Sequence, residues 1–136
     1  MKPRLRVYLA AQYARRDELR VYAKLLEQFG IEVTSRWLDE TEPLNSKMGQ
    51  HSKEFYVTTA AIDLEDVDEA DVLIFFSENP LIGVPRAGRY VEFGYALAKR
   101  KPIYVIGPKE NVFHYSPGVH HYGSLDEFIT LHQHKF

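Results

Sequence analysis

The sequence predicts a single α/β domain in which a parallel sheet carries helices on both faces. Short apolar segments alternate with amphipathic ones along the chain, a pattern typical of strand–helix–strand units. The segment 71–76 (DVLIFF) is apolar after its first residue, as expected of a strand buried on both faces. A chain of 136 residues is long enough for one domain with its own core, so we expect that domain to span 1–136.

Hydrophobic periodicity and terminal residues set the expected elements. Apolar residues at helical spacing precede Gly30, which predicts a helix that ends there. Residues 31–37 (IEVTSRW) alternate at period two and predict a strand, whereas 38–52 are polar and predict a long loop. In chain order we expect strands at 5–11, 31–37, 71–76, 103–106 and 119–122, and helices at 16–29, 53–69, 88–101 and from Ser124 onward.

Two of the helices are expected to bury a defined apolar face. The inner face of the helix at 53–69 should consist of Val57, Ala60, Ala61, Leu64 and Val67. Ser124 and Glu127 form a capping box that opens the last helix. Phe128 and Leu131 are expected to face inward from that helix.

Five strands joined by right-handed crossovers favour a flavodoxin-like, doubly wound sheet with the strand order 2-1-3-4-5. In such a sheet the ligand crevice lies beyond the carboxyl ends of the first and third strands, where the winding reverses. The loops expected at that edge are 12–15, 38–52, 77–87 and 107–118. Functional residues are therefore expected on or next to these four loops.

Charge and composition exclude several classes of function. The net charge of -2 gives no basic excess for nucleic acid or a membrane surface, so neither is expected as a partner. With no cysteine, disulfides and thiolate chemistry are excluded, and a reducing compartment such as the cytoplasm is the expected location. No apolar run approaches the roughly 20 residues of a membrane span, and the run at 7–11 is too short for a secretory signal.

Several kinds of site are disfavoured by the motifs that are missing. The first strand is followed by AAQYARR without a glycine, which argues against a dinucleotide or FMN phosphate cradle. The six histidines show no metal-ligand spacing on an expected helix, so no metal and no cofactor are expected. Ser77 follows a strand but has no nucleophile elbow around it. Carboxylates are the remaining candidates for chemistry.

Glu92 is the carboxylate best placed for chemistry at the crevice. It lies near the start of the helix that Gly88 opens, directly after a loop rich in glycine and proline. A helix N-terminus stabilises an anionic side chain, which suits a carboxylate nucleophile. The same position also suits a surface glutamate that only complements the helix dipole, and spacing alone leaves both interpretations open.

Three segments resemble the nucleoside 2-deoxyribosyltransferases and the related 2'-deoxynucleoside 5'-monophosphate N-glycosidases. They are VYLAA at 7–11, IDL at 62–64 with ADVL at 70–73, and VEFGYA at 91–96 between Gly88 and Lys101-Pro102. The glutamate followed by x-Gly-Tyr-Ala is the most specific of them. The resemblance implies the flavodoxin-like fold and an enzyme that cleaves or exchanges an N-glycosidic bond.

The resemblance also implies catalytic roles for three residues. Glu92 matches the nucleophile that forms a covalent 2-deoxyribosyl ester, which a second base or water resolves. Asp63 matches the aspartate that contacts and protonates the departing base. Tyr8 matches a tyrosine on the first strand that orients the nucleophile. The substrates implied are a 2'-deoxynucleoside or deoxynucleotide and a free nucleobase.

Further positions are expected to bind substrate. Asn111 falls where the family supplies an amide to the 5' end of the sugar from a neighbouring subunit, which implies a homo-oligomer with a shared site. Gln12 and Ser77 follow the first and third strands, and Gly88 begins the helix that carries Glu92. These three residues are therefore also expected to bind substrate.

The sequence departs from the family in ways that leave the reaction open. Arg86 and Arg89 stand near the place where transferases carry a second aspartate and the monophosphate hydrolases a serine, and Gln12 replaces another serine of those hydrolases. The two arginines can anchor a phosphate or can be solvated loop charges. Transfer is the favoured reaction. Hydrolysis of a deoxynucleoside monophosphate, hydrolysis of another N-riboside and a non-catalytic nucleotide-binding module are the alternatives.

Overall fold

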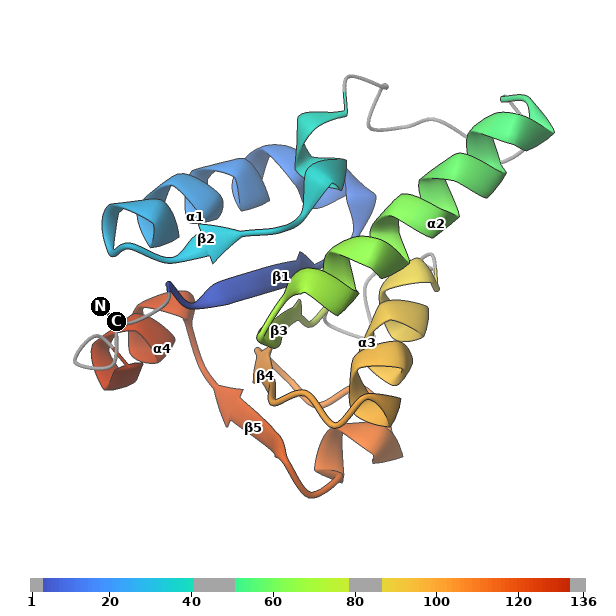
Figure 1. Cartoon of the computed structure of the whole chain (residues 1–136). Helices are drawn as coiled ribbons and strands as arrows, with labels where there is room; N and C mark the ends of the chain where they lie inside the picture. Colours follow the sequence, from blue (N-terminus) through green and yellow to red (C-terminus); the bar gives the residue numbers. More distant parts are fainter. Residues whose placement is uncertain (1–3, 41–50, 79–86, 133–136) are drawn as a thin grey trace.

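The computed structural model describes residues 4–40, 51–78 and 87–132 of the chain (Figure 1). Over these residues, parallel strands alternate with helices, as the sequence pattern predicts. The elements in chain order are β1 (Arg6–Ala10), η1 (Tyr13–Arg15), α1 (Arg16–Gln28), β2 (Glu32–Val33), η2 (Arg36–Asp39), α2 (Lys53–Glu69), β3 (Val72–Phe76), α3 (Gly88–Ala98), β4 (Ile103–Ile106), η3 (Val112–Tyr115), β5 (Val119–Tyr122) and α4 (Leu125–His132), where η marks a 3-10 helix.

The five strands form one sheet in the order β2-β1-β3-β4-β5. All four strand pairings are parallel, with Tyr8 paired to Leu73 and Leu73 paired to Ile103. The predicted strand order and strand direction are confirmed. Strand β3 lies at the centre and all five of its residues are buried, which explains its continuous apolar sequence.

Ring contacts assign the helices to the two faces of the sheet. On one face, Tyr22 of α1 stacks on Phe76 of β3, with ring centroids 5.4 Å apart. Phe128 of α4 packs edge-on against Tyr104, with ring centroids 5.0 Å apart. Tyr104 is on the same face as Phe76, because it is paired with Ile74, which lies two residues from Phe76 in β3. On the opposite face, Phe93 of α3 contacts Phe75 at 5.5 Å, and α2 lies beside α3 (Figure 1).

The predicted second strand is much shorter than residues 31–37. Only Glu32 and Val33 pair with β1, because polar side chains take over the backbone groups of β1 beyond that point. The Leu9 amide donates to Ser35 Oγ at 2.7 Å, and Trp37 Nε1 donates to the Leu9 carbonyl at 2.9 Å. These two bonds end the ladder and turn the chain into η2 towards the carboxyl edge of the sheet.

The predicted inner face of α2 is wrong over its first three turns. Val57 is 59% exposed and Ala60 and Ala61 are also exposed, whereas Val67 is fully buried as expected. The helix contacts the sheet mainly through its last turns, where its buried residues are Asp66 and Val67. Its N-terminal half extends away from the sheet (Figure 1). The packing of α2 therefore depends on its last turns and not on the apolar residues of its first three turns.

Asp66 explains how the last turns of α2 are held. Its carboxylate is buried and accepts from the Arg36 amide at 2.9 Å and from Arg36 Nε at 2.7 Å. The Thr34 hydroxyl donates to the Asp66 carbonyl at 2.8 Å. The connection between β2 and η2 is thus tied to α2 one turn from Asp63. These bonds fix the position of the part of α2 that carries Asp63, at the carboxyl edge of the sheet.

The ends of the last two major helices agree in part with prediction. The Ser124 hydroxyl accepts from the Glu127 amide at 3.2 Å, so the predicted cap of α4 is present. Phe128 is buried, but Leu131 is 49% exposed and Ile129 takes the expected inward position. Helix α3 ends at Ala98 rather than at 101, because Arg100 adopts a left-handed conformation with φ of 60°.

Among the helices that the structure describes, none is both long enough and apolar enough to cross a membrane.

Candidate active site

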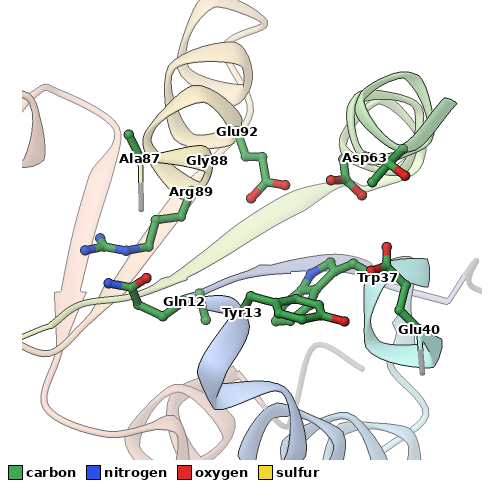
Figure 2. Close-up of a pocket in the computed structure, with 11 residues that line it drawn as sticks. Gln12, Tyr13, Trp37, Glu40, Asp63, Ala87, Gly88, Arg89 and Glu92 are labelled. Atoms are coloured by element: carbon green, nitrogen blue, oxygen red, sulfur yellow. The ribbon is translucent and has the colours of Figure 1, made fainter. Parts of the chain in front are cut away.

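A cavity of about 520 Å³ opens at the carboxyl edge of the sheet (Figure 2). It lies beyond the carboxyl ends of β1 and β3, where the winding of the sheet reverses, which is where the sequence places the crevice. Its volume falls within the range of small-molecule pockets. The lining residues are Ala11, Gln12, Tyr13, Trp37, Glu40, Thr59, Asp63, Ala87, Gly88, Arg89 and Glu92.

Glu92, which is half-buried, and Tyr8 form a hydrogen-bonded pair at the inner end of this cavity. Glu92 is the fifth residue of α3, and its carboxylate points into the cavity (Figure 2). Tyr8 is fully buried in β1, and its hydroxyl donates to Glu92 Oε2. The hydrogen bond fixes the direction of the carboxylate. The structure therefore brings together the two residues that the sequence pairs as a nucleophile and its orienting group.

Burial dominates the protonation of Glu92. It raises the pKa of Glu92 to about 8, against the effect of the Tyr8 hydrogen bond, and the charges of Asp63 and Asp66 add to the rise. Burial also raises the pKa of Tyr8, followed by the charge of Glu92. Tyr8 therefore stays protonated and remains a hydrogen-bond donor to the carboxylate.

Asp63 faces the same cavity from α2, on the wall opposite α3 (Figure 2). Its Oδ1 is buried and has no hydrogen-bond partner among the residues described. Burial raises the pKa of Asp63 to about 7, and the charges of Glu40 and Asp66 raise it further against the opposing charge of Arg36. A carboxyl group in this environment holds a proton near neutral pH and can donate it.

Tyr13 and Trp37 form an aromatic floor that sequence reasoning did not assign. Their ring centroids lie 6.1 Å apart at an interplanar angle of 43°. The Trp37 indole is anchored by its bond to the Leu9 carbonyl, so the ring is fixed at the end of β1. Flat aromatic surfaces of this kind suit a planar ligand. Trp37 is the chain's one tryptophan, which is the signal that could have drawn attention to it.

Three other lining residues were also missed by sequence reasoning. Ala11 and Thr59 contribute small side chains, and Glu40 contributes a third carboxylate beside Asp63 and Glu92. Glu40 lies just after η2 in a segment that the sequence predicts as loop. Only its position at the carboxyl edge of the sheet could have pointed to it.

Arg89 is neither a solvated charge nor part of a loop, although one interpretation of the sequence has it so. It is buried on α3 and its guanidinium forms a two-pronged pair with Glu110, with Nη1 2.6 Å from Oε2 and Nη2 2.9 Å from Oε1. The guanidinium also lies 5.0 Å from the centre of the Phe75 ring and 4.5 Å from that of Tyr90. The charge that Arg89 brings to the cavity is therefore largely compensated.

The remaining expected residues differ in their relation to the cavity. Gln12 and Gly88 line it. Ser77 does not line the cavity, because its side chain is buried against Gly107. A Cβ added at Gly107 would lie only 3.3 Å from the Cβ of Ser77. Asn111 is also outside the lining, and its side chain accepts from the Phe113 amide at 2.9 Å. Arg86 lies outside the described residues.

The described part of the chain contains no group of three or more histidine, cysteine or acidic residues arranged to hold a metal ion. Three carboxyl groups line the cavity, from Glu40, Asp63 and Glu92. An oriented carboxylate and a carboxyl group that holds a proton, both facing one cavity, form the pair used to displace a leaving group at a glycosidic carbon. The aromatic floor beside them suits a nucleobase as that leaving group.

Comparison with known proteins gave a match to a family model over most of the chain. The family model described as nucleoside 2-deoxyribosyltransferase matches residues 7–126, which covers β1 to the start of α4. No curated protein matches the chain.

Several solved structures share the fold, among them the following three. A 2-deoxyribosyltransferase from Bacillus psychrosaccharolyticus is 17% identical, with a TM-score of 0.70 over 90% of this chain and 89% of that one. The CMP N-glycosidase BcmB from Clostridium botulinum is 22% identical, with a TM-score of 0.57 over 93% and 96%. A conserved protein from Enterococcus faecalis V583 is 21% identical, with a TM-score of 0.50 over 95% and 88%.

Proposed function

The chain belongs to the nucleoside 2-deoxyribosyltransferase family, and we propose that it transfers a 2-deoxyribosyl group between nucleobases through a covalent ester on Glu92. The observation that carries this proposal is the half-buried Glu92 carboxylate, oriented by the Tyr8 hydroxyl and facing a cavity with an aromatic floor. A surface glutamate that only complements a helix dipole would have no need of a hydrogen bond from a fully buried tyrosine.

The proposed reaction proceeds in two displacements at C1' of the sugar. In the first, an oxygen of Glu92 bonds to C1' while the bond from C1' to the base nitrogen breaks, and Asp63 gives its proton to the departing base. In the second, a ring nitrogen of another base bonds to C1' and the ester bond breaks. The Asp63 carboxylate takes the proton that the incoming base loses, which restores the starting state.

The two carboxyl groups are suited to different roles by their surroundings. The Tyr8 hydroxyl donates to Glu92 and favours its ionised form, which the nucleophile requires. Asp63 Oδ1 accepts no hydrogen bond, and the negative charge of Glu40 opposes its ionisation. The active state therefore requires the proton on Asp63 and an ionised Glu92, although burial gives Glu92 the higher pKa of the two, about 8 against about 7.

The charges around the cavity favour a nucleoside over its 5'-monophosphate. Three carboxyl groups line the cavity, from Glu40, Asp63 and Glu92. Among the described residues that line the cavity, Arg89 is the one cation, and Glu110 already neutralises it. A phosphate dianion in this environment would face net negative charge. The proposed substrates are therefore a 2'-deoxynucleoside as donor and a free nucleobase as acceptor.

A chromatographic assay with a 2'-deoxynucleoside, with and without a second free base, tests the proposal. We expect a new deoxynucleoside only when the acceptor base is present, because the base resolves the glycosyl ester. Release of free base and free deoxyribose without exchange would establish a hydrolase instead. Faster conversion of the 5'-monophosphate than of the nucleoside would contradict the charge argument.

We further propose that the active enzyme is an oligomer in which Asn111 reaches the site of a neighbouring subunit. Within its own subunit, Asn111 caps η3 and does not line the cavity. Val112, Phe113 and Tyr115 follow it and are exposed, which is unusual for three large apolar side chains within four positions on a free surface. A subunit interface on η3 would cover these side chains and place Asn111 at its border.

Subunit complementation tests the shared site. Glu92→Gln and Asn111→Ala are each expected to be inactive alone, since each removes one half of every site. Mixed oligomers would contain some sites with an intact Glu92 from one subunit and an intact Asn111 from the other. Activity should therefore reappear after the two variants are unfolded together and refolded. No recovery in a preparation shown by native mass spectrometry to contain mixed oligomers would refute this arrangement.

A further inference from the structure

Glu40 and Asp63 lie together at one end of the cavity. Figure 2 shows both carboxyl groups on the side of Trp37 that is remote from Arg89 and Gln12, with Glu92 on the wall between. If Glu92 marks the position of the sugar carbon, as the proposed function requires, the base lies towards the end that holds Glu40 and Asp63. The edge of the base would then face two carboxyl groups.

The position of Glu40 is fixed by its backbone. Arg20 of α1 donates from Nη2 to the Glu40 carbonyl at 2.7 Å and from Nε to the Leu38 carbonyl. The Glu40 amide donates to the Trp37 carbonyl at 3.3 Å, which continues the turn of η2. Helix α1 and η2 together therefore hold the Cα of Glu40 at the mouth of the cavity, beside the aromatic floor.

The two carboxyl groups differ in what they offer a ligand. Asp63 holds a proton and can donate a hydrogen bond, and the charge of Glu40 is, after burial, the largest cause of its raised pKa. Glu40 acts as an acceptor. Glu40 also lies near the Tyr13 hydroxyl. Burial is the largest cause of the raised pKa of Tyr13, the charge of Arg16 opposes it, and the charge of Glu40 adds to the rise. A carboxylate has about four acceptor positions, so contact with Tyr13 is compatible with a bond to a base.

A neighbouring donor and acceptor select among nucleobases. Adenine presents an amino group beside the N7 acceptor, and cytosine presents an amino group beside its ring N3. These edges complement an acceptor at Glu40 and a donor at Asp63. The 6-oxo purines present a carbonyl oxygen where adenine has the amino group, so an oxygen lone pair would face the Glu40 carboxylate. An unpaired buried acceptor of that kind costs binding energy.

We propose that Glu40 makes this protein selective for nucleobases that carry an amino group beside a ring-nitrogen acceptor, adenine and cytosine, over their oxo counterparts. The inference rests on the proposed function, because it takes the position of the base from the role of Glu92. Glu40 acts as the acceptor for the amino group, while Asp63 donates to the ring nitrogen that it protonates as the glycosidic bond breaks.

The test compares deoxyadenosine with deoxyinosine, which differ at the 6-position of the base. For the wild-type protein we expect kcat/KM for deoxyadenosine to exceed that for deoxyinosine by roughly 10- to 100-fold, the range for discrimination by a paired donor and acceptor. Glu40→Gln keeps the shape of the side chain but can turn its amide to donate to the 6-oxo group. This variant should bring the ratio close to one.

A pH profile provides a second measure that a purely structural role would not change. Removing the charge of Glu40 lowers the pKa of Asp63, whose other charged neighbours are Asp66, Arg36 and, across the cavity, Glu92. Glu92 and Asp63 titrate as a coupled pair, so in Glu40→Gln the pH profile of kcat/KM should move to lower pH. Asp39→Asn is the matched control, because Asp39 is exposed next to Glu40 and does not line the cavity. It should change neither the ratio nor the profile.

Equal use of the two nucleosides by the wild-type protein, or an unchanged ratio in Glu40→Gln, would overturn the inference. Calorimetric binding of free adenine and free hypoxanthine separates this outcome from failure of the proposed function. Even if no nucleoside is turned over, tighter binding of adenine that is lost in Glu40→Gln supports the role of Glu40. Equal binding of the two bases rejects it.

Discussion

Glu92→Gln is expected to lower turnover of a deoxynucleoside by at least about four orders of magnitude, as loss of a nucleophile does in other enzymes that form covalent intermediates. The amide cannot form the glycosyl ester, although it fills the same volume beside Tyr8. The measurement is a chromatographic rate with the donor saturating, and Glu92→Ala serves as a second variant. Retention of more than a few per cent of the rate in both variants would exclude Glu92 as the nucleophile.

The same substitution is expected to stabilise the fold, which separates loss of chemistry from loss of structure. The pKa of Glu92 is about 8 in the folded protein against an ordinary value of 4.5. A carboxyl group with a raised pKa destabilises the folded state progressively as pH rises from the unfolded value through the folded one. Glu92→Gln removes that penalty. At pH 8 it should raise the free energy of unfolding by at least about 1 kcal/mol, with no gain at pH 4.

Glu110→Gln should produce the largest loss of stability among single changes near the site, about 3–5 kcal/mol. The Glu110 carboxylate accepts from Arg89 twice, from the Tyr90 hydroxyl at 2.6 Å and from the Glu78 amide at 3.2 Å. Burial alone would raise the pKa of Glu110, but the hydrogen bonds from Arg89 and Tyr90 outweigh it and hold the pKa below its ordinary value. Glutamine would leave the Arg89 guanidinium buried beside a neutral group.

Denaturant unfolding at neutral pH measures this loss. Glu69→Gln is the matched control, because it breaks the ion pair between Arg6 and Glu69, whose side chains are 40% and 63% exposed, and should cost less than about 1 kcal/mol. The double variant Arg89→Met/Glu110→Leu removes both buried charges and should recover part of the lost stability. If Glu110→Gln costs no more than Glu69→Gln, the buried pair between Arg89 and Glu110 does not stabilise the fold.

The architecture could be predicted from sequence because the elements that define it carry strong local signals. Strand β3 is a continuous apolar run, and Gly30 and Ser124 mark helix ends through local backbone chemistry. The errors arose where contacts distant in sequence decide the outcome. The second strand stops early because Ser35 and Trp37 bind the backbone of Leu9, and α2 packs through Asp66 rather than through its alanines.

The site was predictable only in part, for a related reason. Tyr8, Asp63 and Glu92 could be named because they fall in segments with a family pattern, and the structure places them around one cavity or in contact with its lining. Glu40 follows a 3-10 helix that is held by contacts with β1, α1 and α2, all distant in sequence, so no local pattern predicts it. Arg89 showed a charge in the sequence but not the carboxylate, 21 positions away, that binds it.

The attachment of α2 near its C-terminal end affects the two cavity-lining residues that it carries, Thr59 and Asp63, to different degrees. The helix is held at its C-terminal end by Asp66, while its N-terminal half extends beyond the sheet (Figure 1). The helix is therefore anchored at one end only by these bonds. Thr59 lies about two turns from Asp66, and Asp63 lies less than one turn from it. Any change in the tilt of α2 about Asp66 would therefore displace Thr59, which lines the cavity, farther than Asp63.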